Sequence, residues 1–196
     1  MGKLYDVIGV QEYSSIAAGI EALDAMAKAA PVEVITTRTV EPGRLVILIT
    51  GDVASVEASL ARGKAGREAD LVDELFIRNL HPLVIPAVRG QGASGEWDAL
   101  GIIESNSVAA GIEAADLAAK AAGVRVAEIR LSGGMGGKST VKLMGSIHEV
   151  EAAMQAGVRS VADKGLLRRE VTIPNPHPDI RSHVLSLPHE GMDVWK

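Results

Sequence analysis

The chain has 196 residues, of which 47% are hydrophobic and 23% charged, as in an ordinary folded protein rather than a disordered one. A net charge of −5 argues against nucleic acid as the main partner, and the lack of any run of eighteen apolar residues argues against a membrane span. The sequence contains no cysteine, which excludes disulfides, thiol nucleophiles and thiolate-bound metal sites, and no secretory apolar segment follows Met1, so a cytoplasmic location is expected.

The sequence is an internal repeat. Residues 9–30 and 101–122 share 14 identities in 22 positions at an offset of 92. A period of about ninety residues is too long for a solenoid unit and indicates two copies of one small domain. We expect domains at residues 5–90 and 97–182, a flexible linker over 89–96 and a C-terminal tail at 183–196.

In the first copy, a strand is predicted over residues 6–12 and a helix over 16–30, capped by Ser14 or Ser15. Ile16, Ile20, Leu23 and Ala27 fall on one face of this helix. Strands are expected over 32–37 and 45–50, a second helix from Asp52, and a closing strand before the motif at 77–82.

The second copy repeats these elements, with strands at 100–104, 124–131 and 140–144 and a helix at 108–122 that follows the N-cap Ser107. Ser146 and Glu149 have the spacing of a capping box. The next helix carries an apolar stripe of Ile147, Val150, Met154, Val158 and Val161. The order β-α-β-β-α-β predicts an α/β fold class of the α+β sandwich type. Each copy is expected to be a ferredoxin-like domain with an antiparallel-containing sheet and both helices on one face.

Several repeated motifs resemble a known family. They are the strand Gly101–Glu104, the helix ends 25–30 and 117–122 that contain Lys28 and Lys120, and the closing segments 77–82 and 173–178. Over about residues 6–180 they resemble bacterial microcompartment shell domains, in the tandem-domain trimeric form of the PduT-like type.

This resemblance implies a homotrimer whose six domains form a pseudohexameric tile, located in the microcompartment shell beside other shell proteins and, in some cases, encapsulated enzymes. Such a tile is a structural protein without enzymatic activity. Its central pore would pass small polar metabolites, cations or cofactors.

In that family, the turn between the second and third strands lines the pore. Here the pore-lining residues would be Glu41, Pro42 and Gly43 in copy one and Ser132, Gly133, Gly134, Met135, Gly136 and Gly137 in copy two. The second turn is two residues longer, which fits either functional divergence or ordinary loop drift. Some PduT-like proteins bind an iron–sulfur cluster through a cysteine at the position of Glu41, so no thiolate-ligated cluster, and no other cofactor, is expected here.

Glu41 therefore suggests a pore that favours cations or polar metabolites, unless its carboxylate simply points into solvent. The resemblance also places Lys28 and Lys120 at tile edges, beside the segments that contain His81 and His177. The alternative for each lysine is an ordinary helix-end residue favoured by the helix dipole.

The sequence also contains features that are typical of other functions. Residues 133–140 resemble a phosphate-binding loop, but a strand rather than a helix is expected to follow, which argues against nucleotide hydrolysis. The five histidines form no ligand cluster, and neither catalytic nor metal-binding residues are assigned. A trimeric ferredoxin-like sensor of a small ligand, and a monomer with two similar halves, remain as alternatives.

Overall fold

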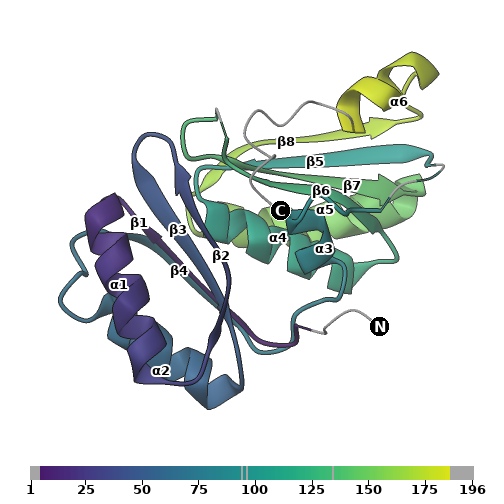
Figure 1. Ribbon diagram of the computed structural model, residues 1–196. Coiled ribbons are helices and arrows are strands. Elements are labelled where there is room, and N and C mark those ends of the chain that lie inside the picture. The colour runs from purple at the N-terminus through teal and green to yellow at the C-terminus, as the bar shows by residue number, and fades with distance from the viewer. Residues whose placement is uncertain (1–4, 94, 96, 134, 186–196) are drawn as a thin grey trace.

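The computed structural model describes residues 5–93, 95, 97–133 and 135–185. Two similar halves follow each other along the chain (Figure 1). The first half comprises β1 (Ile8–Tyr13), α1 (Ile16–Ala29), β2 (Glu33–Val40), β3 (Arg44–Thr50), α2 (Val53–Lys64), β4 (Leu71–Ile77) and the short α3 (Val84–Val88). The second comprises β5 (Ala99–Ser105), α4 (Val108–Ala121), β6 (Arg125–Leu131), β7 (Ser139–Gly145), α5 (Ile147–Asp163), β8 (Leu167–Pro174) and α6 (Pro178–Leu185).

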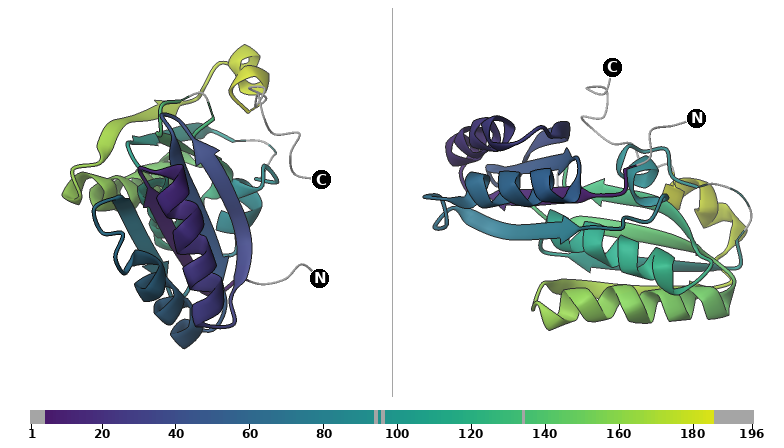
Figure 2. Two further views of the ribbon diagram at one scale, coloured as in Figure 1. Left: turned by 60° about the vertical axis from the view of Figure 1, so that its left-hand side comes forward. Right: turned by 90° about the horizontal axis from the view of Figure 1, so that it is seen from below.

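Each half contains one four-stranded sheet with the same strand order. The orders are β2-β3-β1-β4 and β6-β7-β5-β8, and neighbouring strands within each sheet are antiparallel. In each sheet the third strand lies between the first and second, which is the split βαβ arrangement. The pairs α1 and α2, and α4 and α5, each cover one face of their own sheet (Figure 2). The predicted ferredoxin-like class is confirmed.

The helix starts follow from local chemistry. Ser15 and Ser107 accept the N–H groups of the third residue after them, and Asp52 does the same for α2. Ser146 and Glu149 form a complete reciprocal capping box at the start of α5. These side chains satisfy backbone donors that have no partner within the helix, so the sequence locates the starts well.

The segment between the halves differs from the flexible linker that its composition suggested. The N–H of Ala93 donates to the carbonyl of Val126 at 3.0 Å. A Cβ on Gly92 would lie 1.8 Å from the Ala127 carbonyl oxygen, so only glycine permits this close approach to β6. The described part of the linker is therefore packed against domain 2.

The predicted packing face of α1 is also different in the structure. Ile16 and Ile20 are 37% and 56% exposed, whereas Gly19, Ala22 and Met26 are the buried residues of this helix. The matching positions of α4, Val108 and Ile112, are both 0% exposed. The two helices have closely similar sequences, so the sequence cannot reveal this difference in burial. The difference arises from what packs against each helix.

Two short helices were not predicted. Helix α3 packs through Val84, Ile85 and Val88 onto the core that both halves share. Helix α6 extends past residue 182, where the second domain was expected to end, and lies over the cluster of Trp97, Leu100 and Met144. The guanidinium of Arg181 stacks on the Trp97 ring. Of the predicted tail, residues 183–185 belong to α6 and residues 186–196 lie outside the described residues.

Candidate pore turns and the joint between the domains

The turn between β2 and β3 contains Glu41, Pro42 and Gly43, all of which are exposed. Gly43 has a φ of 101°, a left-handed conformation that favours glycine. The corresponding turn between β6 and β7 runs from Ser132 to Lys138. Gly133, Gly136 and Gly137 also have positive φ values there, and Gly134 lies outside the described residues.

The structure brings these two turns into contact. Oγ of Ser132 donates to Oε2 of Glu41 at 3.2 Å, and this hydroxyl oxygen of Ser132 accepts the N–H of Gly137 at 3.2 Å. A Cβ on Gly137 would lie 2.7 Å from the Glu41 carbonyl oxygen. Residues 91 positions apart in the chain therefore share one site, and the Glu41 carboxylate does not simply point into solvent.

Domain 1 packs on α4 through the helix-free face of its sheet, at β1 and β4. The fully buried carboxylate of Glu12 accepts the N–H of Val108 at 2.9 Å and pairs with Arg44 at 2.7 Å. Asp73 accepts the hydroxyl of Ser107. Both carboxylates thus lie at the N-terminus of α4, where the helix dipole favours negative charge.

A third polar contact lies towards the other end of α4. Oδ1 of Asp116 accepts the backbone N–H of His81 at 2.7 Å, and Oδ2 pairs with Lys120 at 2.6 Å. We call these three contacts, from Glu12, Asp73 and His81 to α4, the closed joint. Its apolar part includes Val10 and Leu75 from domain 1 and Val108 and Ile112 from domain 2.

The repeat supplies a counterpart for each side of the closed joint, and in one chain the two counterparts do not meet. One is the α1 face, with Ser15, Ile16, Ile20 and Asp24. The other is the β8 face, with Glu104, Arg169 and His177, because Glu104 lies opposite Arg169 in domain 2 as Glu12 lies opposite Asp73 in domain 1. Asp24 is 61% exposed, whereas its counterpart Asp116 is 3% exposed.

The four residues expected at tile edges occupy different settings. Lys28 pairs with Asp24 at 2.6 Å on the exposed α1 face, whereas Lys120 pairs with Asp116 at the rim of the closed joint. His81 contributes its backbone to that joint, and the exposed His177 lies 3.6 Å from Asp179. The repeat had shown Asp24 and Asp116 as identical positions, but their role in a domain contact was not recognised, and Glu12 and Asp73 were missed.

Comparison with known proteins bears directly on this repeated arrangement. The model of the BMC domain matches residues 7–80 and again residues 99–176. The chain belongs to the BMC domain family. The two matched segments coincide with the two sheets and their covering helices, and leave out the segment with α3, all of α6 and the chain ends.

Relatives agree with this assignment along most of the chain. The bacterial microcompartment shell protein PduT of Citrobacter freundii is 39% identical over 170 residues, which are 87% of this chain and 92% of that protein. The shell protein PduA of the same organism is 35% identical over 85 residues, 43% of this chain and 89% of that protein. A crystal structure of a microcompartment protein from Desulfitobacterium hafniense has 42% identity and a TM-score of 0.81, covering 90% of this chain and 98% of that one.

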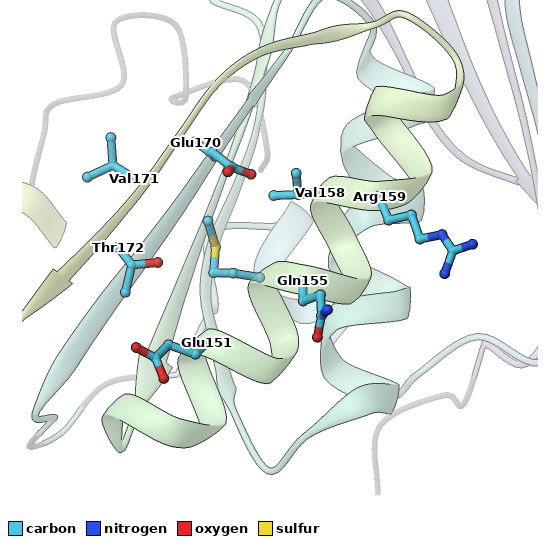
Figure 3. Close-up of a pocket in the computed structure, with 8 residues that line it drawn as sticks. Glu151, Gln155, Val158, Arg159, Glu170, Val171 and Thr172 are labelled. Atoms are coloured by element: carbon cyan, nitrogen blue, oxygen red, sulfur yellow. The ribbon is translucent and has the colours of Figure 1, made fainter.

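Elsewhere, this BMC-domain chain has a hollow of about 440 Å³ between α5 and β8. Glu151, Gln155 and Val158 reach it from α5, and Glu170 and Thr172 from β8 (Figure 3). Carboxylates of Glu151 and Glu170 and the guanidinium of Arg159 line it together with apolar side chains. Within the described ranges, no group of three or more histidine, aspartate or glutamate side chains is placed to hold a metal ion.

Two further expectations can be compared with the fold. The glycine-rich segment that resembles a phosphate-binding loop leads into β7, a strand, as predicted. Among the helices of the described residues, none combines the length and apolar character needed to cross a bilayer.

Proposed function

We propose that this chain is a structural shell protein of a bacterial microcompartment, located in the shell, which assembles as a homotrimeric, pseudohexameric tile. The names of its relatives support the shell assignment. The observation that carries the trimer is the closed joint, because each chain contains one complete joint and the two separate halves of another.

The separate halves fit each other by the logic of the closed joint. The α1 face is the counterpart of α4. The β8 face is the counterpart of the helix-free sheet face of domain 1 that carries Glu12 and Asp73, which we call the β4 face. The α1 face of one chain is therefore complementary to the β8 face of its neighbour. Such a head-to-tail contact is heterologous and produces a ring when the rotation closes. Three chains would place six domains around one axis.

Two of the three polar contacts of the closed joint can be repeated between chains. In the contact between two chains, Glu104 on the β8 face would accept the N–H of Ile16 on its neighbour's α1 face, as Glu12 accepts the N–H of Val108. Asp24 would accept the N–H of the next chain's His177 segment, as Asp116 accepts that of His81. A hollow of about 410 Å³ beside Asp24 and Lys28 leaves room for this segment.

The apolar surfaces follow the same pattern. Ile16 and Ile20 are exposed, while Val108 and Ile112 are fully buried. Ile102 and Val171 on the β8 face are half-buried, whereas their counterparts Val10 and Leu75 are buried. Burial of these side chains in a neighbouring chain would supply the hydrophobic driving force for closure.

The paired turns would surround the axis of this ring and form its pore. Glu41 would recur at every second position, and the longer turn that starts at Ser132 would alternate with it. Three carboxylates around a narrow axis favour cations or polar metabolites. We assign the chain no catalytic activity and no cofactor, and the absence of cysteine rules out a thiolate-bound cluster at Glu41.

Contacts with other shell proteins are placed at the outer edges of the tile. Lys28 and Lys120 have long stems that can pack flat while the ammonium donates to a neighbour's carbonyl groups. The segments with His81 and His177 are the proposed partners. Nδ1 of each imidazole accepts a backbone N–H, from Leu83 or Asp179, so Nε2 is the ring atom proposed for this role.

The native mass of the purified protein tests the proposal. Three chains of 20.5 kDa give a particle of about 61 kDa, to be measured by sedimentation equilibrium or native mass spectrometry over micromolar concentrations. A species of one chain mass throughout that range would overturn it. Flat arrays or tubes at high concentration would support a tile, whereas a discrete trimer that binds a small ligand would support the sensor alternative.

A further inference from the structure

The two kinds of joint differ at one polar contact, and this difference involves charge. In the closed joint Asp73 accepts the hydroxyl of Ser107, the N-cap of α4. The residue at the matching position of β8 is Arg169. An arginine cannot accept a hydrogen bond, so the contact between chains cannot be a copy of the contact within the chain.

The side chain of Arg169 is exposed. It forms no ion pair or side-chain hydrogen bond with the part of the chain that the structure describes. In the ring it would face Ser15 at the N-terminus of α1, and the helix dipole there repels a cation. A carboxylate must lie close by if this contact is to be favourable.

The residue before β4 supplies that carboxylate beside the α1 face. The carbonyl of Asp70 accepts the N–H of Ser14 at 2.8 Å, and Oδ1 of Asp70 lies 3.3 Å from the Ser14 hydroxyl. The Asp70 side chain is therefore held within one residue of the N-cap Ser15. In domain 2 the carbonyl that accepts the matching N–H, from Asn106, belongs to Leu166.

The two substitutions compensate each other. The closed joint has an aspartate on the strand and a leucine beside the helix start, whereas the faces that remain open have an arginine and an aspartate at those positions. We propose that Arg169 of one chain forms an ion pair with Asp70 of the next chain. This pair makes the contact between chains chemically distinct from the contact within the chain.

This pair gives the assembly its direction. The β8 face carries a cation that matches Asp70 beside the start of α1, but finds only Leu166 at the corresponding place beside the start of α4. The β4 face carries an anion, which Asp70 beside α1 would repel. Each strand face is therefore complementary to one of the two helices, and alternation of the two domains around the ring follows.

The inference rests on the proposed trimer, and a charge-exchange cycle tests it separately. The variants are Arg169→Asp, Asp70→Arg and the double exchange, with Arg159→Asp on the outer surface of α5 as a matched control. Sedimentation velocity over a concentration series gives the midpoint of trimer dissociation for each, and circular dichroism confirms that each variant is folded.

We expect each single reversal to raise the dissociation midpoint by about tenfold or more. The double exchange should restore most of the loss, and the control should match the unmodified protein. Raising the salt concentration should weaken the unmodified trimer more than an Arg169→Gln, Asp70→Asn double variant.

Two different failures can be told apart. If the unmodified protein is a trimer and Arg169→Asp leaves its midpoint unchanged, or the double exchange gives no recovery, the ion pair is wrong while the tile stands. If the unmodified protein is a single chain at every concentration, the tile itself is wrong and the ion pair falls with it.

Discussion

Asp116 of domain 2 accepts the backbone N–H of His81 of domain 1 at 2.7 Å. Its repeat counterpart Asp24 has no such donor among the described residues of the same chain and pairs with Lys28. The same side chain at the same helical position is therefore part of a formed contact in one domain and of an exposed surface in the other.

Alanine at these two positions should separate folding from assembly. Asp116→Ala leaves the half-buried N–H of His81 without its acceptor, so we expect a loss of about 1 kcal/mol in the free energy of unfolding. Asp24→Ala should leave the unfolding of the dissociated chain nearly unchanged and raise the dissociation midpoint of the trimer. Urea unfolding and native mass measurements would check both, and equal effects of the two variants on folding would contradict the assignment.

The isoleucines Ile112 and Ile20 form a second matched pair. Ile112→Ala removes a fully buried side chain, and such changes cost about 3 kcal/mol of folding stability. Ile20→Ala changes a residue that is 56% exposed in one chain, so its effect should appear in the trimer dissociation curve. An Ile20→Ala protein that dissociates at the unmodified midpoint would remove the α1 face from the interface.

The capping box at α5 predicts a dependence on pH. The Ser146 hydroxyl and N–H donate to the Glu149 carboxylate at 2.8 and 3.0 Å, and these bonds lower the pKa of Glu149. Because the folded-state pKa lies below the unfolded value, the stabilisation is present above the unfolded pKa and is lost as pH falls through the folded one.

Glu149→Gln should therefore flatten the acid limb of the stability curve, with the larger difference from the unmodified protein near neutral pH. Unfolding midpoints measured from pH 7 down to about pH 3 would show this, with Glu151→Gln on the same helix as a control for the loss of a surface charge. Parallel curves for Glu149→Gln and the unmodified protein would contradict the role of the cap.

The contact between Glu41 and Ser132 bears on the pore. Glu41→Gln removes the proposed ring of carboxylates while keeping a similar shape, so the ratio of cation to anion flux across assembled shells should fall. Ser132→Ala keeps the charge and removes only the hydrogen bond from Ser132, so it should change the flux less. Equal fluxes for Glu41→Gln and unmodified shells would count against a charge-selective pore.

Much of the fold could be predicted because its signals are local. Ser15, Ser107 and Ser146 mark helix starts through their own side chains, and the repeat transfers each assignment to the other copy. The contact of Glu12 with Val108 joins residues 96 positions apart, and no local pattern marks it. Ile20 and Ile112 are identical in sequence context but differ in burial, because only tertiary packing distinguishes them.

For the candidate pore residues, too, the position in the chain could be predicted but the long-range contact could not. The turns at Glu41 and Ser132 were located from the family resemblance, and the structure shows that they touch. Helix α6 follows β8 as α3 follows β4, but no local signal predicted either helix, and the packed segment at Gly92 has no equivalent in the other copy. Their positions depend on Trp97 and on β6, which lie elsewhere in the sequence.

Fusion of the two domains has a kinetic consequence for the proposed ring. Three of its six contacts between neighbouring domains form inside single polypeptides. There the tether keeps the two domains at a high effective concentration however dilute the sample. Only three encounters between separate molecules remain, so fewer bodies must meet by diffusion than in a ring of six independent domains. Dilution would open only the three contacts between chains and release single chains in which the two domains remain packed together.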